Sequence, residues 1–423
     1  MPQEIEDIIM ETSSVHSVGR GSNAEVMQQN NRFAILRYIK DAGIISRKDL
    51  SKLSGLTQAT ITLIIKEFLD KRLVEEVGLI EGNNGRRLTG IRLVKDRFCT
   101  IAVRITSQYF AVGLYDINSE CLQVEKIIYN VFDNISNALS AICAKISALF
   151  EIAHQESLTV LAIAFSLMGF FRFTNKECIM LSESGSYIDL NVYFQKAFNC
   201  PIFYDSSVNY ALYYIACLPQ YNYLRDVTVI HFCISYSTEI AVLQNRHMVK
   251  GATTIPGAIG NVLVPCPTDS TTLVPLDQVL STSYVIARAK MLLVQYPEST
   301  LNEMNSLRSR DLIEGFYQGD IVSLTLYSEI ANALGFVINT LIHIFHPHCI
   351  YLSDEIPTNE TFGRMVIDAT HLYAPRDISY FPQITIIPVK RATALDHTMR
   401  GGSMFATNKI IKSPAFYNDF LPK

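Results

Sequence analysis

Two short amphipathic segments that meet at a single glycine constrain the N-terminal part of this chain more than any other feature. They lie in ISRKDLSKLSGLTQATITLIIKEFLDKR. Ser46 is a predicted N-cap for a first helix with Leu50 and Leu53 on its inner face, and Gly55 ends that helix. Thr57 is a predicted N-cap for a second helix, whose apolar residues recur at helical spacing. These apolar residues are Ile61, Ile64, Ile65, Phe68 and Leu69. Two helices joined by a glycine turn form the helix-turn-helix pattern.

The second helix carries the side chains expected to read DNA. In a helix-turn-helix, the N-terminal residues of this helix face base edges in the major groove. Here they are Thr57, Gln58, Ala59, Thr60 and Thr62. Glutamine pairs with adenine, and threonine and alanine suit thymine methyl groups. The cations expected at backbone phosphates, which position the protein without reading sequence, are Arg47, Lys48 and Lys66.

A strand, a turn and a second strand follow in LVEEVGLIEGNNGRRLTGIRLV. The turn residues Asn83, Asn84 and Gly85 favour a hairpin. Arg86 and Arg87 come at its tip, where a β-wing can place arginines in a narrow minor groove. Residues 26–95 hold 13 Lys or Arg against 7 Asp or Glu, on a chain of net charge −4. This basic block predicts double-stranded DNA as partner, and a small helical interaction module is the alternative.

The composition is that of a globular protein with two or three domains. Of its 423 residues, 49% are hydrophobic and 18% are charged. An uninterrupted apolar run of about 18–20 residues, typical of a membrane span, is lacking, and the acidic N-terminus does not resemble a secretory signal. The nine cysteines lie singly, which favours reduced thiols and a cytoplasmic location. We expect a flexible segment at residues 1–25 and a DNA-binding domain at residues 26–94.

From residue 95 onward, strands alternate with helices in two similar halves. The first half has three strands, a helix near 134–153, a strand in LTVLAIAFSL, and a strand and helix in CPIFYDSSVNYALYYIACL. The second has a ββ unit in VTVIHFCISYSTEIAVLQNRHMVKG, helices over 283–346, and strands in CIYLSDE and ITIIPVK. This pattern predicts an α/β domain at 95–423 with a ligand cleft between two lobes. We expect the lobes at about 95–215 plus the C-terminal helix, and at 216–400.

The winged helix-turn-helix, the segment GRRLTGIRLV and the two α/β halves together resemble the ROK-family transcriptional repressors, over about residues 26–410. The resemblance implies an actin-like, ribonuclease-H-like duplicated α/β fold behind the DNA-binding domain. It also implies a sugar or sugar-phosphate effector, and a homodimer or tetramer that presents two DNA-binding heads.

The sugar kinases of this family hold ATP with glycine-rich loops, and this chain departs from each loop. Arg104 and Thr106 stand where the family has an acid and a glycine. The second loop, CISYSTEIAV, carries Glu239, and the third, YLSDE, carries Asp354 and Glu355. Because glycine lets backbone amides cradle a phosphate, these replacements predict no ATP binding and no cofactor.

The family's catalytic base and zinc ligands are replaced as well. In FYDSSVNYAL, Ser207 takes the place of the aspartate that serves as the catalytic base in the family's kinases. Asp205 lies two residues earlier, so in a strand its side chain would face the same side as that of Ser207, and we expect it to cap a turn. In GATTIPGAIGN, Ala258 replaces a sugar-binding Glu and Asn261 a zinc-binding His. Cys266 alone cannot complete a zinc site. We expect no catalytic residue and no metal.

The residues expected to line an effector cleft stand where the resemblance places the family's sugar-binding, catalytic and zinc-binding residues. They are Ser184, Tyr187, Ser206, Ser207, Asn209, Ala258, Asn261 and Asp277. Asp277 either accepts sugar hydroxyls or caps the helix that begins near Ser281. The leading hypothesis is a DNA-binding repressor of carbohydrate-related genes with an inactive kinase-like sensor domain. An active sugar kinase with a DNA-binding head, and a regulator controlled by a protein partner, are the alternatives.

Overall fold

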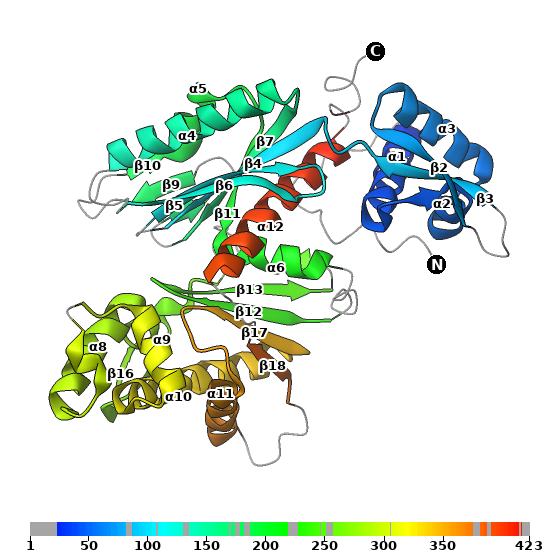
Figure 1. The fold of residues 1–423 in the computed structure, drawn as a ribbon. Helices are drawn as coiled ribbons and strands as arrows, with labels where there is room; N and C mark the ends of the chain where they lie inside the picture. The colour runs from blue at the N-terminus through cyan, green and yellow to red at the C-terminus, as the bar shows by residue number, and fades with distance from the viewer. Residues whose placement is uncertain are drawn as a thin grey trace.

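The computed structural model comprises an N-terminal head and two α/β lobes (Figure 1). We call residues 23–93 the head, residues 98–217 together with 391–412 lobe 1, and residues 229–386 lobe 2. The structure describes residues 23–81, 87–106, 109–129, 135–168, 171–173, 178–181, 187–218, 227–245, 247–250, 257–304, 306–374, 381–386, 391–413 and 416. The predicted tip of the wing and the segment 1–22 lie outside these ranges.

The head is a winged helix-turn-helix. Its helices are α1 (Asn23–Ala42), α2 (Arg47–Ser54) and α3 (Gln58–Asp70), and its strands β1 (Ile45–Ser46), β2 (Val74–Glu81) and β3 (Arg87–Leu93) pair in the order β1-β3-β2. Both predicted caps are present, since the Ser46 hydroxyl accepts from the Asp49 N–H and the Thr57 hydroxyl from the Thr60 N–H. Gly55 ends α2 with φ of 70°, in the left-handed region that glycine tolerates.

The residues predicted to form the core of the head are buried or half-buried, except for Leu53 of α2. Ile61, Ile64, Ile65 and Phe68 of α3 are buried and pack with Leu50 of α2. Leu53, predicted to point inward, is 49% exposed, so that prediction is wrong. The reason is that Leu53 lies in the last turn of an eight-residue helix, just before Gly55 turns the chain towards α3.

Each lobe is built on a five-stranded sheet, and the two sheets repeat one topology. The strand order is β11-β7-β4-β5-β6 in lobe 1 and β18-β17-β12-β13-β14 in lobe 2. In each sheet the first three strands along the chain pair antiparallel, and two later strands are added in parallel beside the first. This repeat confirms the predicted duplicated α/β fold.

The elements of lobe 1 are β4 (Phe98–Ile105), β5 (Tyr109–Asp116), β6 (Cys121–Ile128), α4 (Ile135–Gln155), β7 (Thr159–Leu167), β8 (Phe171–Phe173), β9 (Cys178–Leu181), β10 (Tyr187–Asp189), α5 (Leu190–Ala197), β11 (Ile202–Ser206), α6 (Ser207–Cys217) and α12 (Arg391–Lys412). Helices α4 and α12 cover opposite faces of the large sheet. Because strand residues alternate between faces, Ile101 and Val103 of β4 pack with α4, while Ala102 packs with Met399 of α12.

The strands of lobe 2 are β12 (Val229–Ile234), β13 (Thr238–Gln244), β14 (His247–Met248), β15 (Leu263–Cys266), β16 (Asp269–Pro275), β17 (Cys349–Asp354) and β18 (Gln383–Ile386). Its helices are α7 (Asp277–Leu280), α8 (Thr282–Gln295), α9 (Ser309–Gln318), α10 (Ile321–Phe345) and α11 (Glu360–Tyr373), with short 3₁₀ turns at Ile259–Asn261 and Thr300–Glu303. Most of these elements share one large apolar core.

Helix α6 lies between the lobes and packs against both (Figure 1). On one side, Val208 and Leu212 join Val229 and Ala241 of lobe 2 in a buried cluster. On the other side, α6 packs along α12. Helix α12 in turn reaches the head, since its C-terminal residues share a buried cluster with α1. The two lobes and the head are therefore connected through α6 and α12.

Helices α4 and α10 are long and apolar enough, by length and composition alone, to cross a membrane. Each lies within the packing of a lobe, since α4 buries Leu139, Ile142 and Ile146 against the lobe 1 sheet and α10 is mostly buried in lobe 2. Core helices of globular proteins often have this length and composition, so these two helices are weak evidence for a membrane span.

The close approach of α12 to α6 gives a first prediction. A Cβ at Gly401 would lie 1.9 Å from the carbonyl oxygen of Tyr210, whereas a Cβ at the neighbouring Gly402 would come no nearer than 3.3 Å to side-chain atoms. We expect Gly401→Ala to lower the free energy of unfolding by about 1–3 kcal/mol, because the helices must separate. Gly402→Ala is the matched control, since alanine is the better helix former by about 1 kcal/mol and only side chains would have to shift slightly to make room for it. Equal urea midpoints for the two variants would contradict this account.

Candidate functional site

The exposed face of α3 is the most distinctive polar surface of the head. Gln58, Ala59, Thr62 and Lys66 are exposed on this helix, whose opposite face is buried in the head. Thr57 is exposed and Thr60 half-buried, and their hydroxyls lie 2.9 Å apart within the N-cap. The Thr62 hydroxyl donates to the Gln58 carbonyl oxygen over 2.8 Å. The threonines thus shape the start of α3, while Gln58 and Ala59 project into solvent.

Among the predicted phosphate-binding cations, one forms an ion pair within the head and others are exposed without one among the described residues. Arg47 Nη2 lies 2.7 Å from Glu76 Oε1, and this ion pair connects α2 to strand β2 of the wing. Lys48 and Lys66 are exposed and form no ion pair with any other described residue. Arg87 is the exposed first residue of β3, opposite Glu81. Arg86 lies outside the described residues.

A cavity of about 360 Å³ lies between α2, the start of α3 and the wing. It is lined by Lys48, Asp49, Ser51, Lys52, Gln58 and Leu88. Lys52 was not among the predicted contacts, although its spacing of four residues from Lys48 puts both on one side of α2. Leu63 was also missed. It is 70% exposed beside Ala59 and Thr62, and its place outside the buried stripe of α3 is the signal that would have found it.

In lobe 1, the predicted cleft residues lie at the junction of β11 and α6 and are engaged with one another. The Ser206 hydroxyl caps α6 by accepting from the Asn209 N–H. The Asn209 side-chain amide donates to Asp205 Oδ1 over 2.6 Å, and Lys250 Nζ lies 3.4 Å from Asp205 Oδ2. Ser207 Oγ lies 2.9 Å from Ser166 Oγ. Both oxygens of Asp205 are therefore engaged, but the N-cap of α6 is Ser206, so the expectation that Asp205 is the capping residue is wrong.

The predicted placement of Ser207 relative to Asp205 is wrong. Strand alternation was expected to put the two side chains on the same side, but β11 ends at Ser206 and Ser207 is already the first residue of α6. The strand runs directly into the helix because Ser206 is both its last residue and the N-cap.

In lobe 2, the predicted residues lie on a glycine-dependent turn. Ala258 and Asn261 are exposed, and Asp277 is the first residue of α7. The expectation that Asp277 caps the helix after Ser281 is wrong, because its Oδ1 accepts from the Thr238 N–H over 2.7 Å. A Cβ at Gly260 would lie 1.9 Å from Asp277 Oδ2, so only glycine fits beside this carboxylate.

The other two predicted cleft residues are only partly placed. Ser184 lies outside the described residues, and Tyr187 begins β10. The predicted set is thus divided between the start of α6 in lobe 1 and the turn before α7 in lobe 2.

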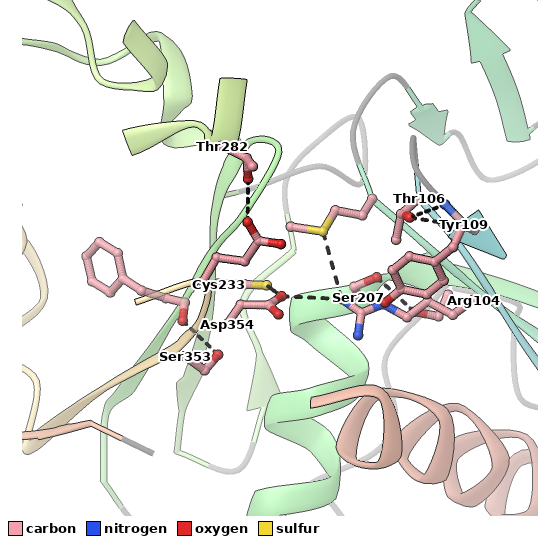
Figure 2. Close-up of polar contacts among 12 residues, drawn as sticks. Arg104, Thr106, Tyr109, Ser207, Cys233, Thr282, Ser353 and Asp354 are labelled. Carbon is pink, nitrogen blue, oxygen red and sulfur yellow. Dashed lines mark hydrogen bonds and ion pairs between the residues drawn. The ribbon is translucent and has the colours of Figure 1, made fainter. Parts of the chain in front are cut away.

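The positions that carry phosphate loops in the kinases hold internal contacts here (Figure 2). Arg104 is buried and lies 3.3 Å from Asp354 across the lobes. The Thr106 hydroxyl donates to the Tyr109 carbonyl oxygen and accepts from its N–H. Glu239 is buried in β13. Among the described residues, no group of three or more His, Cys, Asp or Glu side chains is placed to hold a metal ion.

The head and the lobes of this chain match two different families of known proteins. The chain matches the ROK family over residues 100–409 and the winged helix-turn-helix DNA-binding family over residues 28–75. It is 23% identical to the DNA-binding transcriptional repressor Mlc of Escherichia coli (strain K12), over 78% of this chain and 82% of Mlc. It is 20% identical to a xylose repressor of Caldicellulosiruptor bescii, over 82% of this chain and 87% of that protein.

Solved structures show the same fold. One is a ROK family transcriptional regulator described as a homologue of the E. coli MLC protein, with a TM-score of 0.73, 18% identity, and coverage of 92% of this chain and 100% of that one. Another is a ROK family glucokinase from Streptomyces griseus, with a TM-score of 0.57, 16% identity, and coverage of 72% and 98%. The match to the kinase spans less of this chain. This protein belongs to the ROK family.

Proposed function

We propose that this protein is a DNA-binding transcriptional repressor. The observation that carries the proposal is the exposed face of α3, which presents Gln58, Ala59, Thr62 and Leu63 at the N-terminal half of a helix-turn-helix. Side chains of these types suit adenine edges and thymine methyl groups in the major groove. The repressors to which the chain is similar support the same function.

Around this face, we propose that a set of cations contacts DNA phosphates. Lys48 and Lys52 line the cavity between α2 and the wing, and Lys66 extends the exposed face of α3. Arg87, with Arg86 before it, would follow the wing into the minor groove. Arg47 would act indirectly, because its ion pair with Glu76 ties α2 to β2.

We further propose that the two lobes sense a small ligand and do not catalyse phosphoryl transfer. The two candidate bases support this proposal. Asp205 accepts a hydrogen bond from the Asn209 side chain on one oxygen and pairs with Lys250 through the other, and Ser207 has no useful basicity at neutral pH. The ligand class is a sugar or sugar phosphate, held between Ser206, Ser207 and Asn209 of lobe 1 and Asn261 and Asp277 of lobe 2. Ser184, Tyr187 and Ala258 complete the proposed site.

The proposed regulator works in the cytoplasm without cofactor or metal. A homodimer or tetramer would place two heads on half-sites about one or more helical turns apart. Its working parts are the DNA-binding domain at 26–94 and the sensor domain at 95–423. Carbohydrate-related genes are the proposed targets.

Base readout is tested by substituting the exposed face of α3. After selection of a preferred operator from random DNA, Gln58→Ala should lose discrimination at one adenine, by the roughly 1–3 kcal/mol typical of a bidentate base contact. Leu63→Ala should make binding insensitive to replacement of thymine by uracil at its contact site, because the methyl contact is gone. Gln123→Ala, on an exposed strand of lobe 1, is the control. Unchanged preference in both α3 variants would refute the assignment.

Phosphate contacts are tested by the salt dependence of operator binding. Each lost contact should lower the slope of log K against log salt by about 0.9. We expect this for Lys48→Ala and Lys52→Ala, and twice the change for the double variant Arg86→Ala/Arg87→Ala. Lys290→Ala removes an equally exposed lysine from lobe 2 and should leave the slope unchanged. A similar change in that control would mean that net charge alone is responsible.

The sensor function is tested with a panel of hexoses and hexose phosphates. A ligand of the native state raises the melting temperature in proportion to RT ln(1 + [L]/Kd). We expect stabilisation by at least one member of the panel, and its loss in Asn261→Ala. In a coupled kinase assay, we expect no ATP turnover with any sugar. Turnover that Ser207→Ala abolishes would contradict the inactive-kinase assignment while leaving DNA binding untouched.

A further inference from the structure

One buried ion pair crosses between the two lobes. Arg104 stands near the end of β4 in lobe 1, and Asp354 is the last residue of β17 in lobe 2, 250 residues later in the chain. Arg104 Nη2 lies 3.3 Å from Asp354 Oδ2, and the two side chains are 3% and 16% exposed. Figure 2 shows them meeting near Ser207, the first residue of α6. The pair thus spans the junction where the lobes come together.

The surroundings leave Arg104 dependent on this one carboxylate. Within the described part of the chain, Asp354 is the only acidic group paired with Arg104, and Arg104 Nε has no hydrogen-bond partner. Two further described neighbours of the guanidinium are the Met168 sulfur, 3.9 Å from Nη2, and the Tyr109 ring, whose centroid is 5.9 Å from Cζ. Neither can replace a negative charge. In the arrangement of the lobes seen here, Asp354 is therefore the group that compensates the buried guanidinium charge.

Asp354 is held for this contact by a second bond and by its backbone. The Cys233 thiol of β12 donates to Asp354 Oδ2 over 3.0 Å. Burial first, and then the neighbouring Asp354, raise the pKa of Cys233 well above its ordinary value, so the thiol keeps its proton and remains a donor. Asp354 also has φ of 86°, in the left-handed region that a non-glycine residue rarely occupies.

We propose that Arg104 and Asp354 form a latch that sets the resting angle between the lobes. Opening the lobes at this point must part a guanidinium and a carboxylate that are both shielded from water. A ligand that favours another angle must therefore bind the open form tightly enough to offset breaking the latch. The latch concerns the two lobes alone and does not require that the head binds DNA.

A second contact between the lobes has a different character. Lys250 Nζ lies 3.4 Å from Asp205 Oδ2, but the lysine side chain is 36% exposed, so water screens this pair. The apolar packing of α6 on β12 and β13 has no charge to separate. Of these three contacts between the lobes, the Arg104–Asp354 pair is therefore the one in which opposite charges largely shielded from water would have to be separated.

The test uses the full-length protein and removes the charge of one partner at a time. Asp354→Asn keeps the shape of the side chain, and asparagine tolerates a positive φ, so strain is not added. Arg104→Met keeps the length of the side chain without its charge. The matched control is Glu329→Gln, because Glu329 pairs with Arg288 at 2.6 Å, is also 16% exposed, and lies wholly within lobe 2. Small-angle scattering and amide hydrogen exchange report the lobe angle.

We expect Asp354→Asn and Arg104→Met each to increase the radius of gyration and to speed exchange at the ends of β4 and β17. Tenfold faster exchange would correspond to about 1.4 kcal/mol of lost latch energy. The control should change exchange only around α8 and α10. In the double variant Arg104→Met/Asp354→Asn, the unfolding midpoint should recover, because no buried charge is left alone, while the lobes stay open.

The double variant separates a latch from an ordinary structural ion pair. If its radius of gyration and exchange return to those of the wild type, the pair stabilises the fold without setting the angle, and the latch is refuted. The latch is also refuted if either single variant shows only the local change seen in Glu329→Gln. If Arg104→Met fails to fold, Arg104→Lys takes its place, with the expectation that its retained charge keeps the lobes closed.

Discussion

The packing of α12 on α6 is the contact on which the other parts of this structure depend. The two helices approach so closely at Gly401 that the backbone of α6 takes the place of a side chain. Helix α6 also packs on the sheet of lobe 2, and α12 on the sheet of lobe 1 and on α1 of the head. A change in lobe angle would therefore move helices that are in direct contact with the DNA-binding head.

Several arginines of the head form ion pairs within the domain, whereas three exposed lysines on α2 and α3 do not pair with any described residue. Arg32 pairs with Glu67, Arg47 with Glu76 and Arg92 with Glu75. These pairs join α1 to α3, α2 to β2, and β3 to β2. Lys48, Lys52 and Lys66 form no such pair with other described residues. The excess of basic residues in the sequence thus overstates the number of cations that remain without an acidic partner in the described part of the head, and the exposed lysines of α2 and α3 stay the predicted phosphate contacts.

What the sequence could predict was local. The caps at Ser46 and Thr57 and the left-handed Gly55 follow from the chemistry of single residues, and the repeated order of strands and helices was enough for the duplicated fold. Contacts between distant segments could not be predicted in this way. Arg104 and Asp354 were each interpreted as the loss of a phosphate loop, and only the folded chain shows that the two replacements are partners.

Contacts of this kind also engage the carboxylates at the predicted cleft positions. Asp205 is held by Asn209 and Lys250, Asp277 by the backbone of Thr238, and Asp354 by Arg104 and Cys233. Each of these three carboxylates satisfies a neighbouring donor, so each contributes to holding its part of the lobes in place. A regulator needs from such a cleft only that two arrangements of the lobes differ by a few kcal/mol and that a ligand prefers one of them.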